Sequence, residues 1–592
     1  MRLSLHAQET KRPSSIVLPL TRAAFFAGAL LAAATVAAQP SATVPLRIIA
    51  INDFHGHLEP GDNAVQVPDP DEPTRTLPLR SGGAAYLATR IRQLRTEARH
   101  SVVVSSGDLI GASPLISGLF YDEPTIEVMN EIRLDVNAVG NHEFDRGASE
   151  LARIAQGGCR PNRSTDDRAS CATRDGTYRG ARFPFVAANV EDRHGRPLFA
   201  SSFVREVDGV RVGFIGAVTR STPGIVKADS IAGLRFIAEA QTVNTAAAAL
   251  RAQGVQAIVA VIHEGGDADG GFDGCTQPRG AIFEIERQLD RSIDVVLSAH
   301  THRGYNCRIG ERIVIQGASF GRLVSVVDLT LDRSSGDVLA NQTRARNVTV
   351  PNGLTRDERL ASRYRALEPD PRVAEIVEHH RTRSAPIASR TVGRITETFD
   401  RSPSGGGDSA LGRLIADAQL AATREHGAVL AFTNSGGMRG DLRSHRDNGS
   451  LNYAELYAVQ PFGNVLVTMT LSGTQLKQLL EQQWSARNVE RARMLQPSRG
   501  LSYSWDPTRA VGDRVVAESL RLDGHRVEAE RRYRVTVSDF LAFGGDGFSV
   551  LREGVDAVGG PLDIEALTQY IRRESAARPL APDRGARIRR GG

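Results

Sequence analysis

The sequence has little lysine, cysteine and tryptophan, and only one long uncharged run. Lysine occurs only at positions 11, 227 and 477, although lysine and arginine together number 73. Arginine therefore supplies nearly all the positive charge, which we interpret as a bias of the whole chain without functional content. No arginine-rich tail or stripe stands out. The net charge of +5 falls to +2 without residues 1–38, which carry four positive charges and one negative charge. We therefore expect no nucleic acid polymer as a partner.

The uncharged run lies near the N-terminus, from Ala23 to Ala38, and follows four basic residues. Such a segment, with Val36 and Ala38 at the cleavage positions, is typical of a secretory signal peptide, which we place at 1–38. The run of 16 residues is shorter than the roughly 20 that span a bilayer, so an uncleaved anchor is the weaker alternative. No other stretch could span a membrane. The sequence thus predicts an exported protein, periplasmic or extracellular, without a membrane span in the mature chain.

The four cysteines form an even set in a chain that we expect to reach an oxidising compartment. Three pairings are possible. We favour Cys159 with Cys171 and Cys275 with Cys307, because each pair lies within one inferred loop system. The alternative is free, buried thiols.

At 592 residues, the chain exceeds the size that a single hydrophobic core supports. Short apolar runs alternate with helix-like segments up to about residue 350, which indicates a layered α/β domain. The clearest predicted strands are 46–51, 101–105, 210–218, 257–262 and 293–298. A charged segment without glycine, interrupted by Pro369 and Pro371, predicts a helical linker at 351–385. A second, smaller α/β domain is predicted at 386–580, with helices at 410–423 and 564–573 and a strand at 465–471.

Most of these strands run directly into a residue that can bind a metal. The candidates are Asp53, His55, Asp108, Asn141, His263, His300 and His302. Ligands of open α/β sheets collect at the carboxyl ends of the strands, so we expect these side chains to converge. Asp53 and His55 are two residues apart, and an extended backbone would point both to the same side. Carboxylate, amide and imidazole groups suit a hydrolytic site with two divalent cations, and Zn, Mn, Co and Fe all fit them.

The order of these segments carries a family resemblance. D-x-H, GD, GNHEFD, H and H-x-H resemble the calcineurin-like metallophosphoesterases, and IIAINDFHGHL with VNAVGNHEFD resembles the 5′-nucleotidase branch. The resemblance implies a four-layer αββα sandwich at 44–350. It also implies that Asp53, His55, Asp108 and His302 hold one metal, and that Asp108, Asn141, His263 and His300 hold the other.

The resemblance further implies a catalytic dyad of His142 and Asp145. Three residues apart on one helical turn, the carboxylate can bond the imidazole and fix its orientation. The implied reaction is in-line attack on phosphorus by a hydroxide held between two cations. A plain helix-capping network is the alternative for this pair.

The second domain resembles the 5′-nucleotidase C-terminal domain through TNSGGMRGDL, YAVQPFGN and SDFLAFGGDGF. By that resemblance, five residues bind a nucleotide. Phe462 and Phe540 would enclose the base, Asn434 would bond its edge, Asp546 the ribose hydroxyls and Arg439 the phosphate. Residue chemistry alone supports this less strongly, since a phenylalanine in an apolar run is more often core.

One element of the family pattern is missing. Family members carry an arginine shortly before a Glu-Cys/Ser-x-x-Gly-Asn element, whereas this chain has Gly405-Gly406-Gly407-Asp408-Ser409. Arg401 and Arg413 are the candidates to replace it in space. The choice between mono- and diphosphates therefore stays open.

The sequence as a whole predicts an exported, metal-dependent hydrolase of nucleoside 5′-monophosphates, with UDP-sugars as further candidate substrates. A 2′,3′-cyclic-nucleotide 2′-phosphodiesterase/3′-nucleotidase shares both domains and is the nearest alternative. A non-catalytic nucleotide-binding protein is the alternative of another class. The sequence is silent on oligomeric state.

Overall fold

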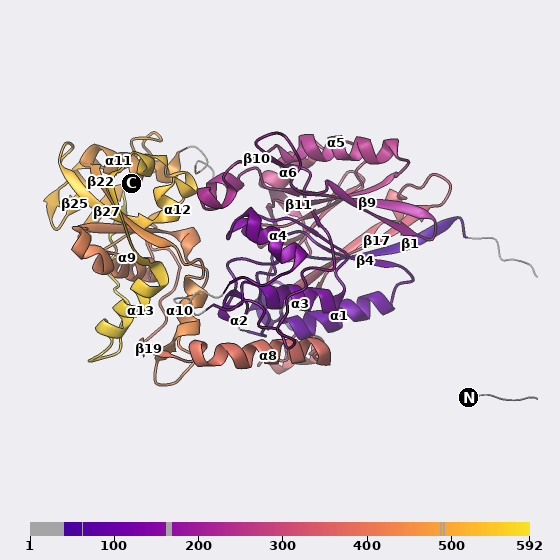
Figure 1. Ribbon diagram of the computed structural model, residues 1–592, viewed down its shortest axis with the longest axis horizontal. Coiled ribbons are helices and arrows are strands. Elements are labelled where there is room, and N and C mark those ends of the chain that lie inside the picture. Colours follow the sequence, from indigo (N-terminus) through magenta and orange to yellow (C-terminus); the bar gives the residue numbers. More distant parts are fainter. Residues whose placement is uncertain (1–40, 62, 162–167, 486–487, 489–491, 592) are drawn as a thin grey trace, which may run out of the picture. The chain divides into compact units, whose positions relative to one another are not determined.

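The computed structural model describes residues 41–61, 63–161, 168–485, 488 and 492–591 (Figure 1). The signal peptide predicted at 1–38 lies outside these residues. No helix within the described part of the chain is both long and apolar enough to cross a bilayer.

Two six-stranded sheets form the first half of the chain. The first sheet contains, in spatial order, β18 (Arg344–Thr349), β17 (Leu323–Asp332), β1 (Thr43–Ile51), β4 (Ser101–Ser105), β5 (Val136–Ala138) and β6 (Phe185–Val186). The second contains β15 (Gly304–Ile309), β16 (Arg312–Gly317), β14 (Val295–Ser298), β11 (Ala257–His263), β9 (Val210–Val218) and β8 (Ser202–Val207). The central strands β1, β4 and β5 run parallel, as do β9, β11, β14 and β16. Their carboxyl ends therefore meet at one edge of each sheet.

The two sheets pack face to face over a valine-rich core. Leu46, Val104, Phe214 and Val259, from both sheets, are fully or almost fully buried in one cluster. The outer face of the first sheet is covered by α1 (Ala84–Thr96), α3 (Glu123–Ile132) and α4 (Ala148–Gln156). The outer face of the second is covered by α5 (Glu239–Ala252) and α6 (Ala281–Glu286). The expected four-layer αββα sandwich is confirmed.

The C-terminal half is a smaller α/β fold. Its five-stranded sheet has the order β23 (Leu495–Pro497), β20 (Leu430–Asn434), β27 (Arg532–Ser538), β22 (Val465–Ser472) and β28 (Val555–Leu562). Helices α9 (Ala410–Thr423) and α13 (Asp563–Glu574) pack together on a core that includes Leu411 and Leu567. The last strand, β29 (Ile588–Arg590), pairs with β24 (Leu501–Trp505), so regular structure continues beyond the predicted boundary at 580.

Two helices occupy the predicted linker. α7 (Glu358–Arg363) ends before the two prolines, and α8 (Pro371–Ala388) begins at the second of them. Asp370 caps α8 by accepting hydrogen bonds from the backbone N–H groups of Arg372 and Val373. α8 lies against α1, α2 (Leu115–Gly118) and α3 (Figure 1). It ends at Ala388, beyond the predicted end of the linker at residue 385.

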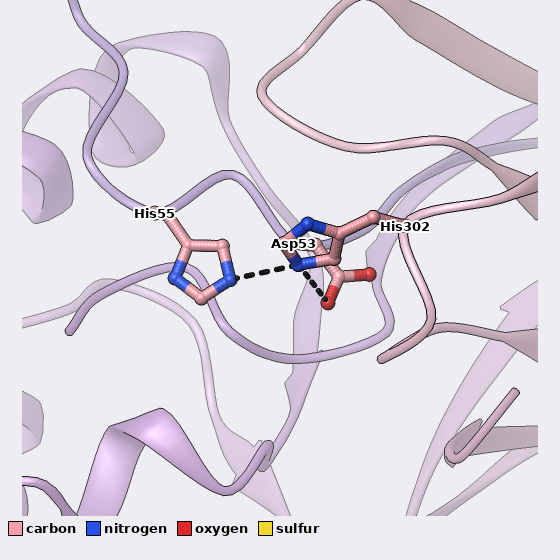
Figure 2. A group of neighbouring side chains, drawn as sticks. All are labelled: Asp53, His55 and His302. Carbon is pink, nitrogen blue, oxygen red and sulfur yellow. Dashed lines mark hydrogen bonds and ion pairs between the residues drawn. The ribbon is translucent and has the colours of Figure 1, made fainter. Parts of the chain in front are cut away.

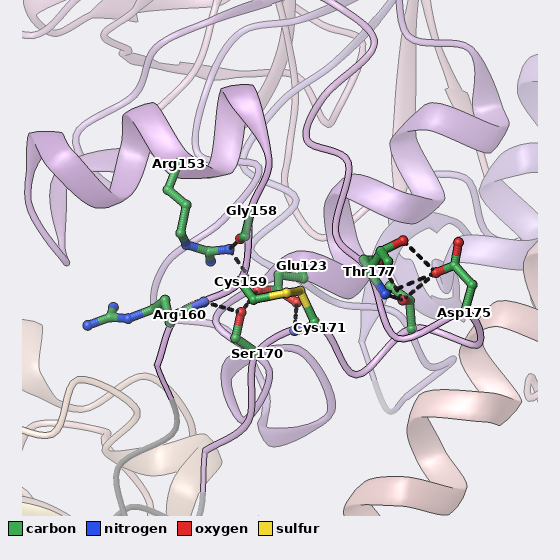
Figure 3. Close-up of a disulfide and its surroundings, with 10 residues drawn as sticks. Glu123, Arg153, Gly158, Cys159, Arg160, Ser170, Cys171, Asp175 and Thr177 are labelled. Carbon is green, nitrogen blue, oxygen red and sulfur yellow. Dashed lines mark hydrogen bonds and ion pairs between the residues drawn. A yellow bond between two sulfur atoms is a disulfide. The ribbon is translucent and has the colours of Figure 1, made fainter.

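The favoured cysteine pairing is confirmed. Cys159 bonds Cys171, and Cys275 bonds Cys307. Figure 3 shows the first disulfide beside Glu123, a carboxylate that accepts hydrogen bonds from the Ser170 hydroxyl and the Cys171 N–H. Each disulfide closes a loop in the first half of the chain, and it reduces the conformational entropy of the unfolded chain more than that of the folded one.

Gly216 on β9 lies where the second sheet approaches β6 of the first. A Cβ atom at this residue would meet the Val186 carbonyl oxygen at 2.4 Å. We expect Gly216→Ala to lower the free energy of unfolding by about 1–3 kcal/mol, because backbone cannot yield as a side chain can. Gly405→Ala, which meets nothing within 4 Å, is the control and should change it by less than about 0.5 kcal/mol. Equal urea midpoints for both variants would contradict this account.

Candidate active site

The seven metal-binding candidates converge at the carboxyl edge of the two sheets. His263 is the last residue of β11, and the others follow the ends of β1, β4 and β5 in the first sheet and of β14 in the second. These and neighbouring side chains form three groups, and within each group the possible ligand atoms all lie within 4.8 Å of one another. They are Asp53 with His55 and His302, Asp108 with His263 and His300, and His55 with Asp108 and His142.

The first group brings three side chains together from two sheets (Figure 2). His302 Nε2 lies 3.3 Å from Asp53 Oδ1 and 3.2 Å from His55 Nε2. His55 Nδ1–H donates to the Gly111 carbonyl oxygen at 2.8 Å. The proton of the His55 ring is thus on Nδ1, and Nε2 presents a lone pair toward His302.

The second group has the same design. His263 Nδ1–H donates to the Ser106 carbonyl oxygen at 2.8 Å, so Nε2 is directed at the other donors. His263 Nε2 lies 3.1 Å from Asp108 Oδ2 and 3.1 Å from Asn141 Oδ1. Asp108 Oδ2 also lies 3.6 Å from His55 Nε2, so this carboxylate faces both groups.

The backbone beneath these donors has an uncommon conformation. Five of the seven candidates have positive φ: Asp53 (47°), His55 (48°), Asp108 (51°), His300 (71°) and His302 (58°). Such residues cost about 1–3 kcal/mol each and cluster at functional sites. The sequence-based reason for pairing Asp53 with His55, an extended backbone, is therefore wrong. A left-handed loop after β1, and not continued strand, brings them together.

The residues present fit a pair of divalent cations. Asp53 and Asp108 are at most 1% exposed, and within the described residues neither forms an ion pair with lysine or arginine. Unpaired buried carboxylates are costly, and imidazole lone pairs facing carboxylate oxygens need a cation between them. Burial lowers the pKa of His263, but the charge of Asp108 outweighs burial and raises this pKa to about 10, so the surroundings of the ring favour positive charge. Mixed nitrogen and oxygen donors suit Zn, Mn, Co or Fe.

His142 and Asp145 form the expected pair. His142 begins a short 3₁₀ helix, η1 (His142–Phe144), and in such a helix residues three apart lie above one another. His142 Nδ1 lies 3.0 and 2.9 Å from the two carboxylate oxygens of Asp145. Burial lowers the pKa of His142, but the charges of Asp145 and Asp108 outweigh it and raise the pKa above its ordinary value. The ring therefore holds its second proton to a higher pH than a free imidazole does.

One cavity collects the predicted substrate residues and part of the metal cluster. Its wall contains Asn141, His142, Asp145, His300, Asn434, Arg439, Phe462, Phe540 and Asp546. The two halves of the chain thus supply one binding cavity.

Within the cavity, Phe462 lies beside the predicted dyad. Its ring is stacked on His142 with 5.8 Å between centroids, and Arg439 Cζ lies 5.8 Å from its centroid. The Phe540 ring packs closely against Gly545, where a Cβ atom would lie 2.5 Å from the ring. Asn434 Nδ2 donates to Asp546 Oδ2 at 2.7 Å.

Neither arginine proposed to replace the missing one lines this cavity. Arg413 is buried in an ion pair with Asp408 at 2.8 Å. Arg401 donates to the Met438 carbonyl oxygen at 3.2 Å, and Met438 precedes Arg439 in the chain. Burial lowers the pKa of Arg439, and the charge of Arg401 lowers it further. Of the two, Arg401 is the one close to the predicted phosphate ligand.

Three charged residues of the site were missed from the sequence. Glu143 accepts hydrogen bonds from the backbone N–H groups of Asp108, Leu109 and Gly140, which ties two of the ligand loops together. Lys227 and Arg493 line the cavity. Glu143 stands inside the GNHEFD motif, but nothing in the sequence around Lys227 or Arg493 marks either one.

Fold and donor cluster together define a metal-dependent phosphoesterase. Residues 46–304 match the family model for calcineurin-like phosphoesterases, and residues 390–553 match the model for the 5′-nucleotidase C-terminal domain. The chain belongs to the 5′-nucleotidase family and is a metallophosphoesterase, a hydrolase of phosphoric monoesters.

Relatives from several bacteria extend this likeness over most of the chain. Endonuclease YhcR of Bacillus subtilis is 31% identical over 93% of this chain, which spans 41% of that protein. Cell wall protein Lmo0130 of Listeria monocytogenes is 31% identical over 92% of this chain and 69% of its own length. Among solved structures, a 5′-nucleotidase precursor from Thermus thermophilus has a TM-score of 0.71 and 26% identity, covering 92% of this chain and 99% of that one.

Bound metal should stabilise the fold measurably. At a free Mn²⁺ concentration of about 100 times its Kd, we expect urea unfolding to show a gain of about 2.7 kcal/mol for each ion over chelator-treated protein. Elemental analysis should find about two ions per chain in the wild type. Asp108→Asn should reduce both values, because this carboxylate faces both donor groups, whereas Asp447→Asn, at an exposed position, should match the wild type. Equal metal content in Asp108→Asn and the wild type would contradict the assignment.

Proposed function

We propose that this protein hydrolyses nucleoside 5′-monophosphates to nucleoside and phosphate outside the cytoplasm, with two divalent cations as cofactors. The observation that carries this proposal is the single cavity whose wall holds both ends of such a substrate's binding site. Phosphate ligands (His142, Arg439) and base or ribose ligands (Phe462, Phe540, Asp546) share it.

The cations are assigned to the two donor groups. Asp53, His55, Asp108 and His302 would hold one of them, and Asp108, Asn141, His263 and His300 would hold the other. When bound, the cations supply positive charge for the phosphoryl oxygens and lower the pKa of water. The protein's contribution is to fix the donors, which the backbone carbonyls of Gly111 and Ser106 do for two of the imidazoles.

His142 acts on the reacting phosphate. Asp145 accepts the Nδ1–H hydrogen bond, which leaves Nε2 directed away from it and toward the donor cluster, where Nε2 can donate to a phosphoryl oxygen or to the leaving oxygen. The charges of Asp145 and Asp108 raise the pKa of His142 above its ordinary value, which favours the proton that the ring would donate. His142 would thus bring a proton donor to the phosphate from η1, beside the loops that would hold the cations.

The second half of the chain holds the nucleoside. Arg439 supplies a guanidinium for the phosphate, since its planar donors match phosphate oxygens. Phe462 and Phe540 offer ring faces for the base, a contact worth roughly 1–3 kcal/mol and tolerant of base identity. Asp546 accepts from the ribose hydroxyls, and Asn434 lies beside it for the edge of the base.

Export is part of the proposal. Two disulfides are typical of an oxidising compartment, and a relative of comparable sequence over 92% of this chain is described as a cell wall protein. The N-terminal segment predicted as a signal peptide fits the same location.

One comparison of substrates tests the proposal. Phosphate release should be faster from AMP than from 2′,3′-cyclic AMP or UDP-glucose, and a chelator should abolish it. Rapid cleavage of the cyclic nucleotide with negligible turnover of 5′-nucleotides would instead establish the phosphodiesterase/3′-nucleotidase alternative. Tight AMP binding without chelator-sensitive turnover would establish a non-catalytic nucleotide-binding protein.

His142→Ala should separate chemistry from metal binding. We expect kcat for AMP to fall by roughly 10²- to 10⁴-fold, the usual effect of one acid–base or electrostatic group, while two metal ions stay bound. His194→Ala, which removes an exposed imidazole on a turn, is the matched control and should keep full activity. Loss of metal from His142→Ala would assign this side chain to the metal ligands.

A further inference from the structure

The ribose end of the cavity contains an arginine that the reaction described above does not use. Arg493 Nη1 donates to Asp546 Oδ1 at 2.5 Å, and both residues line the cavity. The Asp546 side chain is 3% exposed, whereas that of Arg493 is 38% exposed. The carboxylate is therefore buried behind its partner, and the guanidinium keeps an accessible face.

Among the described residues, the side-chain contacts of Arg493 use only a small part of its donors. A guanidinium carries five N–H groups, of which the pair with Asp546 uses one. Arg493 has no second carboxylate partner among the described residues. The other oxygen of Asp546 is occupied by Asn434 Nδ2 at 2.7 Å. Donors that belong to an ion pair and still face a cavity are suited to a ligand anion.

The charges of Asp546 and Arg493 determine which ligand groups can bind at this end of the cavity. A buried carboxylate alone accepts hydrogen bonds from hydroxyl groups and repels a phosphate. With Arg493 paired to it, the local charge is balanced, and the remaining N–H groups add attraction for an anion. The ribose edge thus has an acceptor for hydroxyls and a donor for phosphate side by side.

We propose that Arg493 makes nucleoside bisphosphates, with a second phosphate on the 2′ or 3′ position of the ribose, substrates for removal of the 5′-phosphate. The proposal rests on the assignment of Asp546 to the ribose hydroxyls in the proposed function. Water adds to the 5′-phosphorus, the bond from phosphorus to the 5′-oxygen breaks, and that oxygen takes a proton. The products are inorganic phosphate and the 2′- or 3′-monophosphate.

The test compares kcat/KM for adenosine 3′,5′-bisphosphate, adenosine 2′,5′-bisphosphate and AMP, with the products separated by chromatography. In the wild type, at least one bisphosphate should be hydrolysed within about tenfold of AMP and yield the 2′- or 3′-monophosphate. Arg493→Gln should lower the bisphosphate-to-AMP ratio by about tenfold or more, and Arg493→Lys, which keeps the charge, by less. Comparing the two bisphosphates identifies the ribose position.

A second variant reports on charge and not on folding. Asp546→Asn removes the negative charge from the same pair and should raise the bisphosphate-to-AMP ratio, although it weakens AMP turnover itself. Arg572→Gln, an exposed arginine on α13 that is outside the cavity wall, is the matched control and should leave the ratio unchanged. Opposite shifts in the two variants are not expected from general damage to the cavity.

Three outcomes would overturn this inference. They are an unchanged ratio in Arg493→Gln, a ratio that falls in both variants, and release of the ribose phosphate in place of the 5′-phosphate. Failure of the proposed function itself looks different, because AMP and both bisphosphates would then all resist hydrolysis in the wild type.

Discussion

The rest of the structure depends on two carboxylates, Asp53 and Asp108, that are buried among imidazoles and form no ion pair with a lysine or arginine of the described residues. Their burial favours positive charge beside them, and His55 and His263 direct their Nδ1–H groups to backbone carbonyls, away from the cluster. Glu143 and the carbonyls of Ser106 and Gly111 fix the loops that carry these groups. The left-handed backbone at five donors is retained because this network determines it.

The two-sheet sandwich makes this arrangement possible. Parallel strands in both sheets end at the same edge, so short loops deliver donors from opposite layers without long excursions. The valine-rich core between the sheets keeps the loops in register, and close contacts such as Gly216 on Val186 fix the distance between layers. The positions of the donors at the carboxyl edge therefore depend on packing in the core between the two sheets.

The other half of the chain supplies most of the cavity residues that we propose for binding the nucleoside. The cavity joins the dyad and two metal-binding candidates to Arg439, two phenylalanines and the Asn434–Asp546–Arg493 cluster. In the proposed function, phosphoester cleavage depends on one half of the chain and nucleotide recognition on the other. Because the chain has so few lysines, arginine supplies nearly all of its positively charged side chains. Position in the fold distinguishes an arginine in a structural ion pair, such as Arg413 with Asp408, from an arginine in the cavity wall, such as Arg493.

The sequence by itself predicted the layered α/β fold, most strand positions and the donor candidates that the structure brings together, because apolar runs and the residues that follow them are local patterns. It also favoured the disulfide pairing that the structure shows, whereas the pairing of His142 with Asp145 was implied by the family resemblance. It did not determine that Asp53 and His55 sit on a left-handed loop, that Arg413 is committed to Asp408, or that Arg493 faces Asp546 across 53 positions of sequence. Those relations depend on contacts between distant segments, and such contacts exist only after the chain has folded.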